Sequence, residues 1–374
     1  MAVKAWGAGA EKKAKTLSAK ASGAVASASA SGRGAVARQL EPADSSRVEE
    51  IFFSNDAVSL CLLVNRRVKT MRVIDFRAGP TNAKRMFVLS LAHREGVEKV
   101  YTLVERDEVA TWVKLGFAKE GNIPGFYKRS DAFMLGCSVS AATNGRAPIQ
   151  SEMRLAARAP ITMRPPRDAN GRLRFDSEPP RILEPEPEPV EEIVDTRAHD
   201  FAEKTLVKAK KAAKELADKS FPVAKIVPMK DADVKKPLAA ALKAGRALTA
   251  FEPFGRDVQR RYFNVTARGG FELVVSTESQ ACFGNAFLEL LTAPKNDAER
   301  LATTSTLKTL CDRLLAEGVV TCFALAPSDD IGLATAFVYN GFRRTGLLQN
   351  HIVVGNERKD VIIFSRKLAN PADD

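Results

Sequence analysis

K-L-G-F at Lys114–Phe117 returns later in the chain as Y-N-G-F at Tyr339–Phe342. In both places a predicted amphipathic helix ends at the Gly-Phe step and a predicted strand comes after it. The spacing continues beyond this step, because Gly121 of K-E-G and Gly346 of R-T-G stand at the same distance from it. Two copies of one pattern at one offset indicate that one domain type is duplicated.

The segments around both stretches alternate between short apolar runs, which predict strands, and amphipathic runs after a capping residue, which predict helices. The first segment predicts strands Val58–Asn65, Val68–Phe76 and Val97–Val104, a helix capped by Thr81 or Asn82, a helix Glu108–Leu115 capped by Asp107, and strand residues at Phe126–Tyr127 and Ala132–Leu135. The second predicts strands Tyr262–Thr266, Phe271–Ser276, Asn285–Leu291, Val319–Ala326 and Val361–Leu368, a helix from Asp297 or Ala298, and a helix capped by Ser328.

Two stretches outside these segments have few large apolar residues. Residues 1–44 are rich in Ala, Ser, Gly and Lys, and residues 142–200 contain the alternating run Glu184–Pro189. Such segments bury too little apolar surface to offset the entropy of ordering, so we predict a disordered tail and a disordered linker. A Lys/Ala-rich helix is predicted over 201–220, and folded domains over 45–141 and 221–370.

Composition limits the classes of function. The 374 residues are 45% hydrophobic and contain no apolar run long enough for a transmembrane helix, so no membrane partner is expected. Five scattered cysteines and three histidines predict free thiols, a cytoplasmic location and no metal site. About half of the net charge of +12 comes from residues 1–40, which indicates weak, non-specific contact with nucleic acid or, alternatively, a solvated tail.

Two regions resemble a known family. The segment Val100–Leu135, with L-G-F, E-G-N-I-P-G-F-Y and S-D-A-F, resembles the C-terminal half of GNAT N-acyltransferases, in particular the β-lysine N-acetyltransferase branch. N-G-F-R-R-T-G-L-L-Q-N-H and R-K-D-V-I-I-F-S-R-K-L in the second copy resemble the same half of that fold. The resemblance implies an α/β (α+β) class with two domains, each a mixed, mostly antiparallel sheet flanked by helices. It also implies that acyl-CoA lies in a cleft where two central strands separate.

The resemblance further implies a phosphate-binding turn before the helix that follows the fourth strand. Free N–H groups and the helix dipole there would hold the pyrophosphate of acetyl-CoA. The matching residues of the first copy are Arg77, Gly79, Thr81, Asn82 and Ala83. Those of the second copy are Lys295 and Asn296, which stand beside two acids and lack a glycine. An ordinary strand-to-helix turn is the alternative in both copies.

Catalytic candidates are few. Many family members have a tyrosine that protonates the leaving thiolate, but the matching positions here are Trp112 and Phe337. Tyr339 lies two positions later and is the candidate acid, with packing as the alternative. Glu105, at the end of a predicted strand, is the candidate base that would make an amine neutral for attack, with helix capping as the alternative. His351 near the last hairpin is a further candidate base, or else a structural residue.

Substrate binding has one pair of candidates. Asp131 and Asp360 occupy matching positions of the two copies and are candidates to bind a cationic amine. A hairpin salt bridge with Arg129 or Arg358 is the alternative. The leading function is therefore an acetyl-CoA-dependent N-acetyltransferase acting on a primary amine of a small amino acid, a polyamine or a protein lysine. The alternatives are an inactive tandem scaffold, an acyl-CoA-binding module, and a non-specific polyanion binder.

Overall fold

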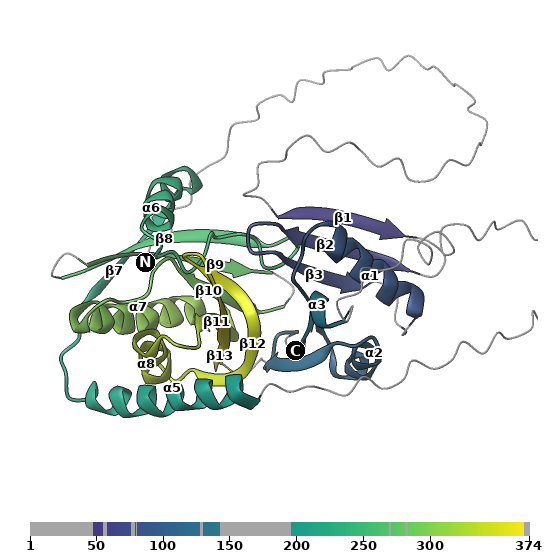
Figure 1. Ribbon diagram of the computed structural model, residues 1–374. Coiled ribbons are helices and arrows are strands. Elements are labelled where there is room, and N and C mark those ends of the chain that lie inside the picture. Colours follow the sequence, from purple (N-terminus) through teal and green to yellow (C-terminus); the bar gives the residue numbers. More distant parts are fainter. Residues whose placement is uncertain are drawn as a thin grey trace, which may run out of the picture. The chain divides into compact units, whose positions relative to one another are not determined.

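One mixed sheet of thirteen strands runs through the described residues, in the order β1-β2-β3-β4-β6-β5-β12-β13-β11-β10-β9-β8-β7 (Figure 1). The computed structural model describes residues 48–369, apart from 55–57, 76–78, 80, 128–129, 143–195, 269–270 and 281–282. Residues Asp44–Asp374 form one compact unit, and the other unit, Met1–Ala43, lies outside the described residues. Helices pack against this mixed sheet, which confirms the predicted α/β (α+β) class.

The first half of the compact unit carries the first Gly-Phe step. Its strands are β1 (Glu49–Ser54), β2 (Ser59–Asn65), β3 (Thr70–Asp75), β4 (Lys99–Val104), β5 (Ala118–Ile123) and β6 (Ala132–Ser138). Its helices are α1 (Asn82–Arg94), the 3-10 turn η1 (Arg106–Glu108), α2 (Val109–Lys114) and α3 (Val139–Ala142). Helix α1 begins where the sequence predicts, because the Thr81 side chain accepts a hydrogen bond from Lys84 N.

The second half carries the second Gly-Phe step. Its strands are β7 (Ala224–Met229), β8 (Gln259–Ala267), β9 (Phe271–Ser279), β10 (Asn285–Leu290), β11 (Thr321–Pro327), β12 (Arg343–Val354) and β13 (Glu357–Lys367). Its helices are α5 (Thr196–Glu215), α6 (Asp231–Lys243), α7 (Asp297–Ala316) and α8 (Ile331–Tyr339). Helix α7 begins as predicted, because the Asn296 side chain accepts a hydrogen bond from Glu299 N at 2.9 Å.

Both halves order their last four strands in the same way. In the first half, β4 pairs in parallel with β3 and antiparallel with β6, and β5 pairs with the other edge of β6. In the second half, β11 pairs in parallel with β10 and antiparallel with β13, and β12 pairs with the other edge of β13. Helices α1 and α7 make the two parallel crossovers. The repeated sequence pattern therefore corresponds to a repeated order of paired strands.

Several predicted boundaries were wrong. Helix α8 is capped by Asp330, whose side chain accepts a hydrogen bond from Leu333 N, and not by Ser328. Asp107 caps no helix, because the chain before α2 forms η1, whose N-cap is Glu105. Phe126–Tyr127 lies in a turn rather than a strand, and the strand that pairs with β6 is β5 instead. Helix α5 also begins and ends earlier than the predicted range 201–220.

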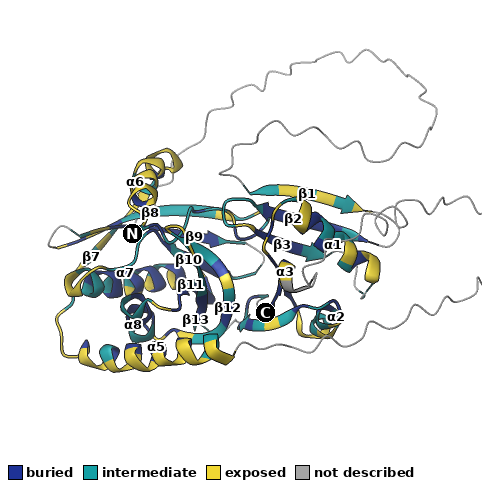
Figure 2. Ribbon diagram, viewed as in Figure 1, coloured by how far each residue is buried: buried dark blue, intermediate teal, exposed yellow. Residues whose placement is uncertain are grey.

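Hydrophobic side chains fill both faces of the second half's strands. Successive residues of β9 point to opposite faces, so Leu273 and Val275 pack with α5, α7 and α8, while Val274 packs with α6. Figure 2 shows the resulting layers, with buried central strands and helices whose outer surfaces are exposed. The functional side chains described below must therefore emerge at strand ends and loops.

The two halves meet through an aromatic core and through one close backbone contact. Tyr101 and Phe126 of the first half pack with Phe254, Phe287 and Phe323 of the second. Strands β5 and β12 pair at a single position, where Gly121 stands opposite Gly346. These two glycines are equivalent in the repeated sequence pattern, so the contact joins each half through the same residue.

Some predictions fall outside the described residues. These are the disordered tail 1–44 with its contact to nucleic acid, most of the linker 142–200, and the Arg77 side chain. They stay predictions, as does the cytoplasmic location. Among the described residues, no helix is both long enough and apolar enough to cross a lipid bilayer.

Candidate functional site

Strands β10 and β11 separate in the middle of the sheet. They are paired in parallel from Asn285 and Thr321 up to Leu288 and Ala324, and not beyond. From there β10 stays paired with β9, while β11 stays paired with β13. Side chains can therefore enter the space between β10 and β11 without breaking the hydrogen bonds of β10 with β9 or of β11 with β13. The first half has the matching separation, because β3 and β4 stop pairing after Val73 and Thr102.

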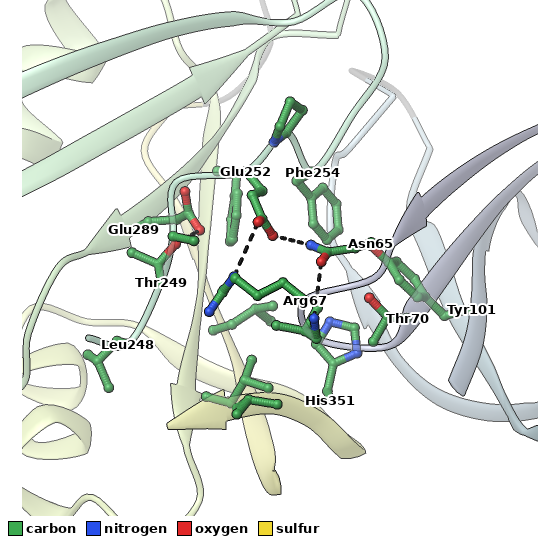
Figure 3. Close-up of a pocket in the computed structure, with 17 residues that line it drawn as sticks. Asn65, Arg67, Thr70, Tyr101, Leu248, Thr249, Glu252, Phe254, Glu289 and His351 are labelled. Carbon is green, nitrogen blue, oxygen red and sulfur yellow. Dashed lines mark hydrogen bonds and ion pairs between the residues drawn. The ribbon is translucent and has the colours of Figure 1, made fainter. Parts of the chain in front are cut away.

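A pocket of about 100 Å³ lies at the separation of β10 and β11 (Figure 3). Three of its walls come from the second half: the ends of β10 and β11, the C-terminal end of β12, and the loop 248–254 before β8. The fourth wall comes from the first half and is made by Asn65, Arg67, Val68, Thr70 and Tyr101. Both halves are therefore needed to complete the pocket.

Glu289 near the end of β10 is, with Glu252, one of two acids that line this pocket. Thr249 Oγ1 donates to its Oε1 at 2.5 Å, and Ser276 Oγ and Arg260 Nη1 both donate to its Oε2 at 3.1 Å. Burial raises the pKa of Glu289, while the Arg260 charge acts in the opposite direction. The carboxylate is thus fixed in position and is a stronger base than an exposed one.

Arg260 lies behind the pocket and is shared by two acids. Besides Glu289 it pairs with Glu278, and it also donates to the backbone oxygen of Glu252. Glu278 in turn accepts the backbone N–H groups of Phe254 at 2.9 Å and Gly255 at 2.7 Å. This network fastens the loop 248–254 to the sheet. Its two carboxylates and one guanidinium leave negative charge at the pocket.

Glu252 connects the loop to the first half. Asn65 Nδ2 donates to one of its carboxylate oxygens, and Arg67 Nε donates to the other at 3.2 Å (Figure 3). Asn65 is itself oriented by the backbone, since its Oδ1 accepts a hydrogen bond from Val68 N. The β2–β3 turn of the first half therefore holds the pocket loop of the second half.

His351 of β12 supplies an uncharged polar group. Only 6% of its surface is exposed, and its ring packs edge-on against Tyr101 with 4.9 Å between the ring centroids. Burial, together with the positive charges of Lys99 and Arg358, places the pKa of His351 well below its usual value, so the imidazole is neutral. Its Nδ1 is buried and has no hydrogen-bond partner among the described residues.

The matching place in the first half has different chemistry. Ile74 is the residue after the last parallel pair of β3, so it stands where Glu289 stands in β10. Asp75 follows it and forms a buried ion pair with Lys84. Lys84 also donates to the backbone oxygen of Gly79 at 2.9 Å and lies over the Trp112 ring at 6.0 Å. The first half therefore has an ion pair beside its strand separation and no counterpart of Glu289.

The predicted phosphate-binding turns differ between the halves. At α1 the first helical turn has no acid, Gly79 has a φ of +120°, and Asn82 and Ala83 are exposed. This end of α1 presents N–H groups and a positive dipole without competing carboxylates. Gly79, Thr81, Asn82 and Ala83 stay a predicted phosphate site of the first half.

At α7 the first turn carries two acids. Asp297 pairs with Arg300, and Glu299 accepts a hydrogen bond from Lys295 N at 2.7 Å. Asn296 is used as the helix cap. The two carboxylates of this turn therefore occupy Arg300 and a backbone N–H group, which makes it a weak site for a pyrophosphate.

The other predicted residues lie outside the pocket lining. Glu105 is exposed and precedes η1, and Tyr339 packs against Phe221 with 4.9 Å between the ring centroids. Asp131 accepts a hydrogen bond from Gly125 N, and Asp360 accepts one from Asn350 N, each at 2.8 Å. Gly125 lies in a turn, whereas Asn350 lies at an irregular position of β12. The alternative partner of Asp360 forms a different ion pair, since Arg358 pairs with Glu98.

Sequence reasoning identified His351 as a candidate base but missed Glu289 and Arg67, which line the same pocket. Glu289 was included in a predicted strand without a role, and its signal was a carboxylate within the apolar run N-A-F-L-E-L. The sequence pattern predicts only a turn at Arg67. Among the described residues, no group of three or more His, Cys, Asp or Glu side chains is placed to hold a metal ion.

No family model matches the chain, and no curated protein matches it. Among solved structures, it is similar to the ribosomal-protein-S18-alanine N-acetyltransferase from Escherichia coli, at 17% identity over 41% of this chain and 98% of that chain, with a TM-score of 0.31. It is also similar to spermidine N-acetyltransferase from Vibrio cholerae in complex with CoA and spermine, at 11% identity over 40% and 98% of the two chains, with a TM-score of 0.33.

Proposed function

We propose that the protein is an acyl-CoA-dependent N-acyltransferase built from two GNAT-like copies, in which the second half transfers the acyl group to a primary amine. One observation carries the proposal: the buried acid Glu289 faces a pocket where the parallel strands β10 and β11 stop pairing. The sequence resemblance at Tyr339–Phe342 supports the same assignment. The first half has Ile74 in place of Glu289 and contributes a wall of the pocket instead.

The residues in the pocket suit this reaction. The amine nitrogen attacks the thioester carbonyl carbon, the C–S bond breaks, and the sulfur leaves as the thiolate of CoA. An amine must lose a proton to attack, and Glu289 is the group that accepts it. His351 is neutral and offers a second hydrogen-bonding group. Trp112 and Phe337 are unable to protonate the thiolate, so water is its proton source.

The size and charge of the pocket support a small amine. A cavity of roughly 150 Å³ holds a benzene molecule, so the pocket of about 100 Å³ holds only a few non-hydrogen atoms. Its lining contains the carboxylates of Glu252 and Glu289 but one guanidinium, that of Arg67. This excess of negative charge attracts an ammonium group and disfavours an anion.

The test is calorimetric titration of acetyl-CoA into the full chain, followed by an assay for CoA thiol released in the presence of small amines. Micromolar binding together with amine-dependent thiol release is the expected result. Binding without thiol release from any amine would leave an acyl-CoA-binding module. Absence of binding would overturn the acyltransferase assignment and favour an inactive scaffold.

Asp297→Asn is expected to tighten acetyl-CoA binding by about two- to fivefold, because it removes a carboxylate from the N-terminal end of α7, which faces the phosphates in this proposal. A charge at a helix end contributes about 0.3–1 kcal/mol. Titrations of the variant and the parent chain at low salt would measure the change. The matched control is Glu272→Asn, an exposed change on β9 that is expected to leave the affinity unaltered. Equal affinity in Asp297→Asn and the parent chain would place the phosphates elsewhere.

A further inference from the structure

We infer that Arg67 recognises a carboxylate of the acceptor, so that the acceptor is a small amino acid rather than a simple amine or a polyamine. The inference rests on the proposed function for the amine end of the acceptor. It adds a contact at the other end of the acceptor, made by Arg67 of the first half, which has no counterpart of Glu289. Arg67 is therefore a specificity-determining residue of the pocket.

The position of Arg67 is the first step. It lies in the turn between β2 and β3 of the first half and lines the pocket of the second half. Figure 3 shows its side chain extending across the pocket, toward the side formed by Thr249 and Glu289. The guanidinium and the Glu289 carboxylate thus belong to one small space, although they come from different halves.

The unused hydrogen-bonding capacity of Arg67 is the second step. Its Nε donates to Glu252 Oε1 at 3.2 Å, and this contact orients the guanidinium. Its Nη1 and Nη2 groups have no hydrogen-bond partner in the described part of the chain, and 29% of the side chain is exposed. A guanidinium has five N–H donors in a fork that matches the two oxygens of a carboxylate. The terminal nitrogens are therefore available for such a ligand.

The surrounding charges decide which anion fits. Glu252 and Glu289 line the same pocket, so a dianion such as a phosphate monoester would meet two carboxylates for one guanidinium. A small amino acid adds no net charge to the pocket, because its ammonium group lies at Glu289 and its carboxylate lies at Arg67. The small volume limits the acceptor to a short amino acid, and the free Nδ1 of His351 offers one more polar contact.

The experiment compares alanine, alaninamide and putrescine as ligands of the full chain, by calorimetry without acetyl-CoA and by CoA thiol release with it. Alanine is expected to bind at least about tenfold more tightly than alaninamide, because a hydrogen-bonded charge pair is lost in the amide. Arg67→Gln is expected to remove this difference. The matched control is Arg66→Gln, because Arg66 lies in the same turn but pairs with Glu49 and Glu95 away from the pocket.

Equal binding of alanine and alaninamide, or tighter binding of putrescine than of alanine, would overturn the role of Arg67 in recognising a carboxylate. A loss of alanine preference in Arg66→Gln as well would also overturn it, because the effect would then belong to the whole turn. The two proposals fail separately. Arg67-dependent binding of alanine without thiol release would refute the acyltransferase assignment alone. Thiol release with amines regardless of a carboxylate would refute the amino-acid assignment alone.

Discussion

Replacing Glu289 with glutamine is expected to lower the rate of acyl transfer by about 10²–10⁴, the usual contribution of a positioned proton acceptor. The amide keeps the shape of the side chain and can still accept a hydrogen bond from Thr249, but it is unable to accept the proton of the amine. Affinity for acetyl-CoA should stay close to that of the parent chain. Steady-state release of CoA thiol measures the rate, and calorimetry measures the affinity.

The matched control for this substitution is Glu272→Gln. Glu272 lies on β9, next to β10 in the sheet, but its carboxylate is exposed and bonds to Asn264. The same chemical change should therefore leave the rate unaltered. A rate in Glu289→Gln within about threefold of the parent chain would show that Glu289 is structural, through its contacts with Arg260 and Ser276. His351 and Glu252 would then be the remaining proton acceptors in the pocket lining.

The pH dependence of the acyl-transfer rate is a second test of the role of Glu289. The carboxyl accepts a proton only when ionised, so acyl transfer should fall as the pH is lowered through its pKa. Because burial raises this pKa, the midpoint of the fall should lie above the range of an exposed carboxyl. The same limb should be absent from the pH profile of Glu289→Gln. A profile that is identical in the variant would assign the limb to another group.

Local signals predicted much of the fold. Thr81 caps α1 as predicted, and α7 begins at the predicted Asp297 after the cap Asn296, because each cap places an oxygen where the first free N–H groups of a helix need one. The sequence gives no such signal for β5, whose residues A-K-E-G-N-I lack an apolar alternation. This strand lies at the joint of the two halves, where Glu120 pairs with Lys99 and Gly121 meets Gly346. Tertiary contacts therefore decide its structure.

The pocket was much less predictable than the fold. The contacts of Glu289 with Thr249 and Arg260, and of Glu252 with Asn65, join residues that are far apart in the sequence. Their meeting depends on how the loop 248–254 crosses the sheet and on how the halves join, and neither is encoded in a local pattern. The predicted candidates were chosen by position in a family motif. Among them, Asp131 bonds to the backbone of a nearby turn, where aspartate is common for local reasons, and Asp360 bonds to the backbone of β12.

Substituting valine for Gly346 is expected to lower the free energy of unfolding by about 3 kcal/mol, the upper part of the range for overpacked sites. A Cβ on Gly346 would lie 2.5 Å from the Cα of Gly121 and 2.6 Å from the backbone oxygen of Glu120. Backbone atoms are unable to move aside as a flexible side chain can, so β12 and β5 would have to separate. Urea unfolding followed by circular dichroism measures the loss.

A side chain at Gly121 would meet the same backbone from the other strand, since a Cβ there would lie 2.6 Å from the Cα of Gly346. Gly121→Val should therefore destabilise the protein to a similar extent, as expected if the halves meet through equivalent residues. The control is Gly332→Ala in α8, where the nearest atoms to an added Cβ are 3.5 Å away. That change should be neutral or stabilise the helix by up to about 1 kcal/mol. Wild-type stability in both valine variants would mean that β5 and β12 do not meet at these glycines, and the first half would then be free to leave the pocket of the second.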